Sequence, residues 1–88
     1  MRVLFTDDAW DDYCWWVAND VTILVRLNEL IENVRRTPFK GIGKPEPLKE
    51  NLAGFWSRRI TQQHRLVYEV SGEGETQTVT IIQCRFHN

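Results

Sequence analysis

The sequence predicts an α+β fold in which two N-terminal helices pack on a small antiparallel sheet. Two observations support this prediction: apolar residues recur at helical spacing up to residue 34, and apolar and polar residues alternate in the last third of the chain. A chain of 88 residues can build two packed layers around one small core. We therefore expect a single domain over residues 1–88.

The N-terminal part of the chain predicts one strand and two helices. Met1–Phe5 is a short apolar segment, and Thr6 with the acids after it provides a helix N-cap. We expect the first helix from about Asp7 to Asn19 and the second to end before Pro38, which makes a helical hairpin turning near Asn19. The repeating positions are Trp10, Tyr13, Trp16, Val17, Leu24, Leu27, Ile31 and Val34.

Residues 37–47 predict an irregular loop, because three prolines and two glycines interrupt regular structure there. This loop carries Lys40, Lys44 and Glu46. Charged groups on such a loop can be presented outward to a ligand.

Three strands are predicted to close the chain as an antiparallel meander: Phe55–Thr61, Arg65–Val70 and Gln77–His87. A Gly-containing turn at 71–75 separates the last two. Alternation along the last strand predicts Ile82, Cys84 and Phe86 on the same face.

A three-residue turn over 62–64 predicts the register of the first two strands. It sets Ile60 opposite Leu66 on the core face and gathers Arg59, Arg65 and His87 on the other face. By the same alternation Arg58 shares the side of Ile60. We interpret it as an edge cation or an ion-pair partner, and a direct contact of Arg58 with an RNA ligand is an equally open alternative.

Charge is distributed unevenly along the chain. Residues 35–65 hold eight of the eleven Lys and Arg residues against only Glu46 and Glu50, a local net charge of +6, although the whole chain has net charge −1. A positive region of this kind attracts polyanions.

Neither a signal peptide nor a membrane span is recognisable, so we expect a cytoplasmic protein. Cys14 and Cys84 do not have the spacing of a metal site, and we interpret both as buried free thiols.

The charged groups suit RNA cleavage without a metal or cofactor, since RNA supplies its own 2'-hydroxyl nucleophile. Glu46 is the candidate base. His87, with a reference pKa of about 6.5, is the candidate acid, and Arg65, Arg59 and Lys49 are the candidate cations. Taken alone, Glu46 is more often a solvated loop acid and His87 a frayed tail.

Other residues have simpler interpretations. His64 is predicted to be a turn residue. The tryptophans of the first helix are interpreted as core and interface residues, and Trp56 as a core or hairpin anchor.

Several motifs together resemble the YoeB branch of the RelE superfamily of bacterial toxins, and the similarity runs from end to end. The motifs are Ala9–Tyr13, Arg36–Phe39, Gly43–Lys49, Trp56–Ile60 and His64–Tyr68. The resemblance implies the RelE-like, microbial-ribonuclease-like fold. It also implies a ribosome-dependent mRNA interferase that cuts mRNA in the ribosomal A site and inhibits translation.

The resemblance also implies roles for single residues. Glu46 would be the general base, His87 the general acid and Arg65 the ligand of the transition-state phosphate. Further substrate contacts would come from Lys49, Arg59, Lys44 and Asn88.

The implied partners are a YefM-like antitoxin, the 70S ribosome and mRNA. Operator DNA would be bound only through the antitoxin complex, in which the toxin acts as co-repressor. The aromatic-rich first helix favours a homodimer.

The chain departs from the family at its end, where His is typically followed by Tyr and here His87 is followed by Asn88. Because an aromatic ring that helps to hold the substrate base is missing, we expect reduced or altered activity. A translation inhibitor or co-repressor that binds without cleaving is the alternative. A ParE-like gyrase poison ranks third, since that class lacks this arrangement of Glu and terminal His.

Overall fold

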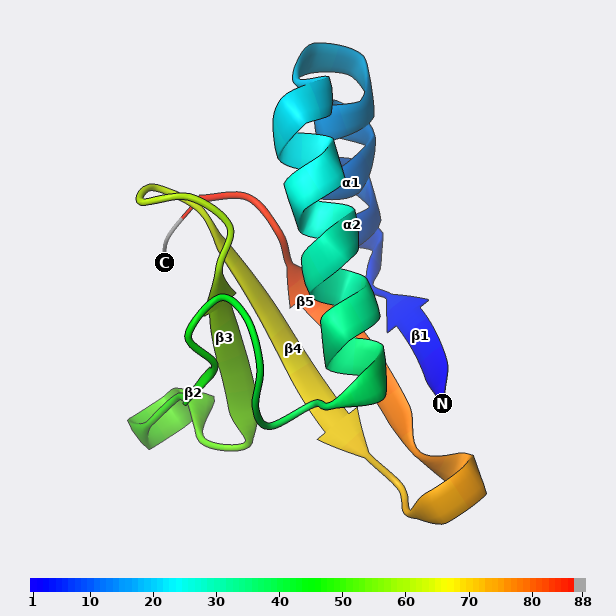
Figure 1. Cartoon of the computed structure of the whole chain (residues 1–88). Helices are drawn as coiled ribbons and strands as arrows, with labels where there is room; N and C mark the ends of the chain where they lie inside the picture. Colours follow the sequence, from blue (N-terminus) through cyan, green and yellow to red (C-terminus); the bar gives the residue numbers. More distant parts are fainter. Residues whose placement is uncertain (87–88) are drawn as a thin grey trace.

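A five-stranded sheet carries two helices side by side on one face (Figure 1). The computed structural model describes residues 1–86, so His87 and Asn88 lie outside the described residues. The elements are β1 (Arg2–Phe5), α1 (Asp7–Asn19), α2 (Val21–Arg36), β2 (Glu46–Pro47), the 3₁₀ turn η1 (Glu50–Leu52), β3 (Phe55–Arg59), β4 (Arg65–Ser71), the 3₁₀ turn η2 (Gly74–Thr76) and β5 (Thr78–Gln83). The α+β prediction is confirmed.

The strand order is β1-β5-β4-β3-β2. The predicted antiparallel meander of β3, β4 and β5 is present, and β2 adds a fourth antiparallel strand. Strand β1 instead pairs parallel with β5, which places the first strand of the chain beside the last (Figure 1).

Helix α1 begins at the predicted cap, Thr6, and α2 begins at a second cap, Asp20, at the predicted turn of the hairpin. Thr6 Oγ1 accepts a hydrogen bond from the Ala9 N–H at 3.1 Å, and Asp20 Oδ1 accepts one from the Ile23 N–H at 3.1 Å. Each bond satisfies a backbone donor that the first turn of a helix leaves open. A single residue, Asp20, therefore ends α1 and starts α2.

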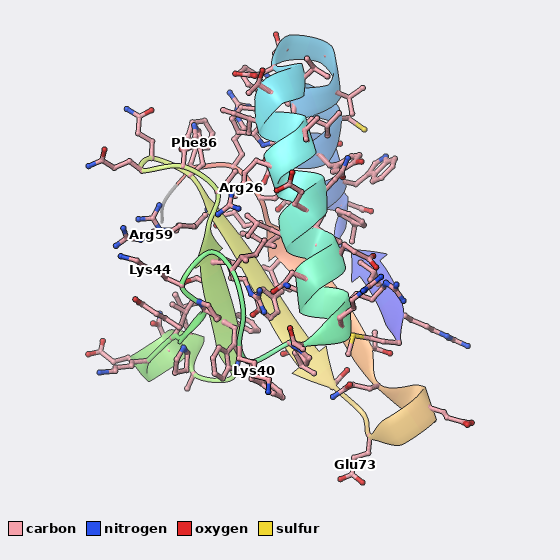
Figure 2. The ribbon with its side chains drawn as sticks, viewed as in Figure 1. Arg26, Lys40, Lys44, Arg59, Glu73 and Phe86 are labelled. Carbon is pink, nitrogen blue, oxygen red and sulfur yellow. The ribbon has the colours of Figure 1, made fainter. Side chains whose placement is uncertain are left out.

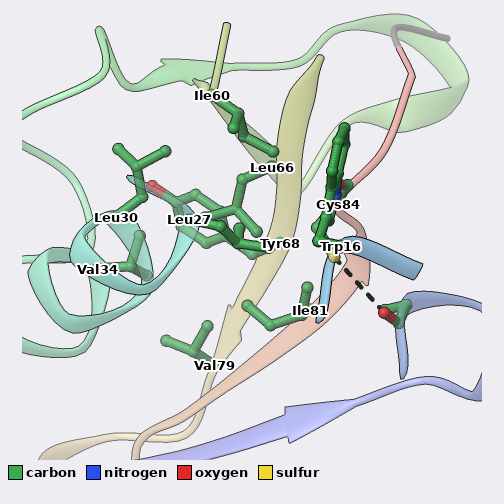
Figure 3. Packing of buried hydrophobic residues seen from close by; sticks show 11 residues of the cluster. Trp16, Leu27, Leu30, Val34, Ile60, Leu66, Tyr68, Val79, Ile81 and Cys84 are labelled. Atoms are coloured by element: carbon green, nitrogen blue, oxygen red, sulfur yellow. Dashed lines mark hydrogen bonds between the residues drawn. The ribbon is translucent and has the colours of Figure 1, made fainter. Parts of the chain in front are cut away.

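The core lies between the helices and the sheet (Figure 3). Its buried residues are Ala9, Trp16, Leu27, Leu30, Val34, Ile60, Leu66, Tyr68, Val79, Ile81 and Cys84. Each fully buried aliphatic side chain contributes about 1.5–3 kcal/mol to stability. Within the part of the chain that the structure describes, neither helix has the length and apolar character needed to cross a bilayer.

The predicted register of β3 and β4 is wrong by two residues. Arg58, not Ile60, lies opposite Leu66, and Arg59 lies opposite Arg65. The connecting loop is longer than three residues because Thr61 Oγ1 accepts the N–H groups of Gln63 and His64 and stabilises a wider turn. A shift of two residues preserves the faces, so both arginines still share the predicted surface.

The end of the chain also differs from the prediction, because β5 stops at Gln83. The pairing passes from Tyr68↔Ile81 to Val67↔Gln83 and leaves Ile82 as an extra residue in a bulge. The face that packs into the core is therefore formed by Val79 and Ile81, while Ile82 is only half-buried.

Two residues that were predicted to be buried, Phe86 and Cys14, are exposed instead. Phe86 is exposed rather than on the core face. Cys84 is a buried free thiol as predicted, whereas Cys14 is exposed, because its position on α1 faces away from the sheet.

Candidate active site

A hollow of about 290 Å³ lies on the face of the sheet opposite the helices. Its lining residues are Lys44, Glu46, Leu48, Leu52, Ser57, Arg59, Arg65 and Val67. Side chains alternate along a strand, so Ser57, Arg59, Arg65 and Val67 face away from the core that Arg58, Leu66 and Tyr68 face. Figure 2 shows Lys44 and Arg59 projecting on the same side of the sheet.

Strand β2 positions Glu46 at the edge of this hollow. Glu46 lies opposite Ser57 and Pro47 opposite Trp56, so the last two residues of the predicted loop in fact pair with the sheet. The Leu48 N–H extends the pairing by donating to the Phe55 carbonyl at 2.8 Å. The Glu46 side chain is exposed, which leaves its carboxylate accessible to a ligand.

Arg59 and Arg65 are paired across β3 and β4. Arg59 is exposed and Arg65 is half-buried. Carbonyl oxygens of the loop between these strands fix the Arg65 guanidinium, with Nη1 donating to Thr61 at 2.7 Å, Gln62 at 3.2 Å and His64 at 3.1 Å. Arg65 is thus the anchored cation of the hollow, and Arg59 is the exposed one.

Lys44 reaches the hollow from the 37–47 loop. Its φ of 53° and the φ of 81° at Gly43 turn the chain sharply there. The Gly43 carbonyl accepts the Arg59 N–H at 2.7 Å, and a Cβ at Gly43 would come within 2.7 Å of Leu30. Glycine is therefore needed at this close approach to place the next residue, Lys44.

Lys49 is the one described candidate that the structure leaves outside the lining of the hollow. It is exposed and precedes the 3₁₀ turn η1. His87 and Asn88 fall outside the described residues.

Arg58 has a role that the sequence analysis missed. It is completely buried, contrary to the prediction of an edge cation. Its Nη2 donates to the carbonyls of Thr37 at 2.7 Å and Lys40 at 2.9 Å, and its Nη1 to the carbonyl of Ile42 at 3.0 Å. Further bonds run to the Asn33 side chain and the Tyr68 hydroxyl. Arg58 therefore holds the loop that carries Lys44 and Glu46 in place through these hydrogen bonds.

Within the described residues 1–86, no ion pair neutralises the cations of the hollow. Among residues 1–86, the ion pairs join Glu32 to Arg35 and Arg36 on α2, away from this site. An acid and three cations thus line one water-accessible depression, an arrangement suited to a phosphodiester.

The chain is similar to known toxins over its whole length. It is 52% identical to Toxin YoeB of Escherichia coli K12 over 87 residues, covering 99% of both chains. The structure of a YoeB/ParE toxin from Agrobacterium tumefaciens matches with a TM-score of 0.95 at 53% identity, covering 100% of both chains. A YoeB dimer and the toxin of a heterotetrameric YoeB–YefM complex, both from Staphylococcus aureus, match with TM-scores of 0.87 at 38% identity, over 100% of this chain and 98% of each of theirs.

Fold and similarity together define a toxin of a bacterial type II toxin-antitoxin system, and the predicted RelE-like fold is confirmed. The family described as "YoeB-like toxin of bacterial type II toxin-antitoxin system" matches residues 5–88. The chain belongs to this family.

Proposed function

We propose that this toxin is a ribosome-dependent mRNA endoribonuclease that cuts the codon in the ribosomal A site and so stops translation. The observation that carries the proposal is the shared hollow, which brings Glu46 together with Lys44, Arg59 and Arg65. The end-to-end similarity to YoeB toxins supports the same function.

In the proposed reaction Glu46 takes the proton of the 2'-hydroxyl, and the 2'-oxygen forms a bond to phosphorus. The bond between phosphorus and the 5'-oxygen breaks as His87 donates a proton to that leaving oxygen. The products are a 2',3'-cyclic phosphate and a free 5'-hydroxyl. Each proton transfer contributes roughly 10²–10⁴ in rate.

The cations act on the phosphoryl oxygens. Arg65 is already held by three loop carbonyls, so its guanidinium needs little reorganisation to stabilise the developing charge. Arg59 and Lys44 contact the same phosphate region from the exposed side. Lys49, outside the hollow, binds a neighbouring phosphate, and Asn88 contributes to substrate binding.

The proposed partners are a YefM-like antitoxin and a second copy of the chain, and operator DNA is bound through the antitoxin complex. Complexes and dimers of the Staphylococcus aureus relatives support these partners. The exposed aromatic side chain of Trp10 on α1 is one surface that such a contact would cover.

Primer extension on a defined mRNA in translating ribosomes tests the function, with wild type, Glu46→Ala and His87→Ala compared and a ribosome-free control. Cuts within the A-site codon that need ribosomes and both residues support it. Uncut mRNA on stalled ribosomes would instead identify a translation inhibitor that binds without cleaving, the alternative favoured by Asn88 in place of tyrosine.

A further inference from the structure

The last described residue of the chain is held by two hydrogen bonds to neighbouring segments. The Phe86 N–H donates to His64 Nδ1 at 2.8 Å, and the Phe86 carbonyl accepts the Arg65 N–H at 2.9 Å. Phe86 has a φ of 67°, a left-handed conformation that an L-residue rarely adopts without support. Both backbone groups of this residue are therefore fixed, immediately before His87 in the chain.

The His64 ring is itself fixed. It packs against the Trp16 ring in an edge-to-face arrangement, with 4.8 Å between ring centroids, and the Phe86 ring lies 5.8 Å away. Trp16 is buried, and its Nε1 donates to the Cys84 carbonyl at 2.8 Å. A chain of contacts thus connects the core, through Trp16 and His64, to the backbone that leads to His87.

The hydrogen bond requires one protonation state of His64. Nδ1 accepts a hydrogen bond only when it carries no hydrogen itself. The ring must therefore be neutral, with its hydrogen on Nε2. Burial, and after it the charge of Arg85, lowers the pKa of His64 from its usual 6.5. The neutral form is therefore present at pH 7, and protonation at lower pH would replace the acceptor with a donor.

The charged groups around this ring come from three neighbouring segments. Arg85 follows β5, and its guanidinium lies 3.6 Å from the ring centroid of Trp15. Asp20, at the junction of the helices, lines the same groove, but its Oδ1 accepts the Ile23 N–H. Arg65 follows His64 in the chain and is held by the loop carbonyls.

We propose that neutral His64 is a positioning residue for the general acid: by accepting the Phe86 N–H it fixes the backbone immediately before His87, the proposed acid. This inference rests on the proposed ribonuclease function. It gives His64 a function in catalysis without contact with RNA, which the interpretation as a turn residue did not include.

Two nearly isosteric substitutions separate this role from simple packing. Asparagine places its Oδ1 where His64 Nδ1 lies and keeps an acceptor that does not titrate. Glutamine places its oxygen nearer to the Nε2 position and loses the acceptor. We expect His64→Gln to lower kcat for A-site cleavage roughly 100-fold, as expected for a misplaced catalytic group, with KM little changed. We expect His64→Asn to restore most of that loss.

The pH dependence gives a second readout. In wild type the cleavage rate should fall as pH drops through the pKa of His64, whereas in His64→Asn this fall should be absent. Similar rates and pH profiles for wild type and His64→Gln, with both proteins folded by circular dichroism, would overturn the proposal.

A third readout does not depend on activity. The amide resonance of Phe86, followed by NMR from about pH 8 to about pH 5, should shift with the same midpoint as the His64 ring in wild type and should not shift with it in His64→Asn. If the Phe86 amide resonance does not shift as His64 titrates, the inference is overturned, while the proposed ribonuclease function is unaffected. A wild type that cuts no mRNA would remove the function, and the amide titration would still decide whether neutral His64 holds the chain.

Discussion

Arg59 and Arg65 lie directly opposite one another on adjacent antiparallel strands. Like charges in this position destabilise a sheet, by about 0.2–1 kcal/mol on the scale of cross-strand pairs. Among residues 1–86, no carboxylate forms an ion pair with either arginine. The pair is thus a local cost in stability that an anionic substrate would offset.

The first prediction tests that cost. Arg59→Gln should raise the free energy of unfolding by about 0.2–1 kcal/mol in low salt, and the gain should disappear near 1 M salt, where charges are screened within about 3 Å. The same variant should lose cleavage activity. Urea unfolding at both salt concentrations measures the effect.

Arg35→Gln is the matched control, because that arginine is paired with Glu32 and its removal should not stabilise the protein. A less stable Arg59→Gln protein in low salt would show that the arginine pair is not repulsive.

Glu46→Gln should reduce cleavage by roughly 10²–10⁴ because it removes the proposed base. Stability should change little, since the side chain is exposed at the edge of the sheet. Single-turnover cleavage on programmed ribosomes gives the rate, and thermal melting gives the stability. Glu50→Gln, an exposed acid outside the lining of the hollow, should cleave at the wild-type rate. Equal activity of the two variants would assign proton abstraction to another group.

Arg58→Leu should destabilise the protein by more than about 3 kcal/mol, because several acceptors lose their donor and each buried, unsatisfied group costs about 1–3 kcal/mol. The carbonyls of Thr37, Lys40 and Ile42 and the Tyr68 hydroxyl are among these acceptors. Urea unfolding measures the loss. Arg59→Leu, the same change one residue along the chain at an exposed position, should be tolerated. Similar midpoints for the two variants would rule out a structural role for Arg58.

Local signals made most of the fold predictable. The cap at Thr6 and the helical spacing of apolar residues predicted α1 and α2 because a helix is built from contacts close in sequence. Alternation also placed Arg59 and Arg65 on one face, since parity survives a register error of two residues.

The remaining features depend on contacts between distant segments. The burial of Arg58 was not predictable because most of its partners are carbonyls of the 37–42 loop, and a carbonyl has no sequence signature. The bulge at Ile82 shifts the alternation by one residue, so Ile82 was assigned to the wrong face, whereas Cys84 was assigned correctly. Phe86 is exposed because β5 has already ended at Gln83 and the chain turns at the φ of 67° of Phe86. Alternation along β3 could have predicted that Ser57 shares the face of Arg59. Its place in the hollow could not be predicted, because it depends on the pairing of Ser57 with Glu46 of β2.

The two thiols should differ strongly in reactivity. Cys14 is exposed, whereas Cys84 is buried and donates from Sγ to the Ala9 carbonyl at 3.5 Å (Figure 3). Burial, and then the charge of Asp12, raises the pKa of the Cys84 thiol to about 12, and the thiolate is the reactive form.

A disulfide reagent should therefore modify one thiol quickly in the native protein and the second only on unfolding. Absorbance of the released thiol follows both phases. Cys14→Ser should remove the fast phase and Cys84→Ser the slow one. Fast modification of Cys84 in native Cys14→Ser would contradict the buried position.

Asp12 provides a prediction on pH and stability. Its Oδ2 accepts the Cys84 N–H at 3.1 Å where β5 has ended. Burial raises the pKa of Asp12 from its usual 3.8, and the Cys84 hydrogen bond and the charge of Arg85 offset this only in part. Between pH 3.8 and the folded pKa, the folded protein therefore binds more protons than the unfolded chain. Stability contributed by this group falls as pH rises through that window and stays lower above it.

Asp12→Asn keeps an acceptor for the Cys84 N–H and removes the charge. The variant should match wild type below the window and become more stable than wild type above it, with the difference appearing as pH rises past 3.8. Urea unfolding of both proteins from about pH 3 to about pH 7 measures this difference directly, because all other titrating groups are shared. Asp11→Asn makes the same charge change at an exposed neighbour and should show a much smaller effect. If Asp12→Asn were instead less stable at neutral pH, attraction between the Asp12 carboxylate and Arg85 would outweigh its desolvation, and ionised Asp12 would be holding the start of the C-terminal segment in place.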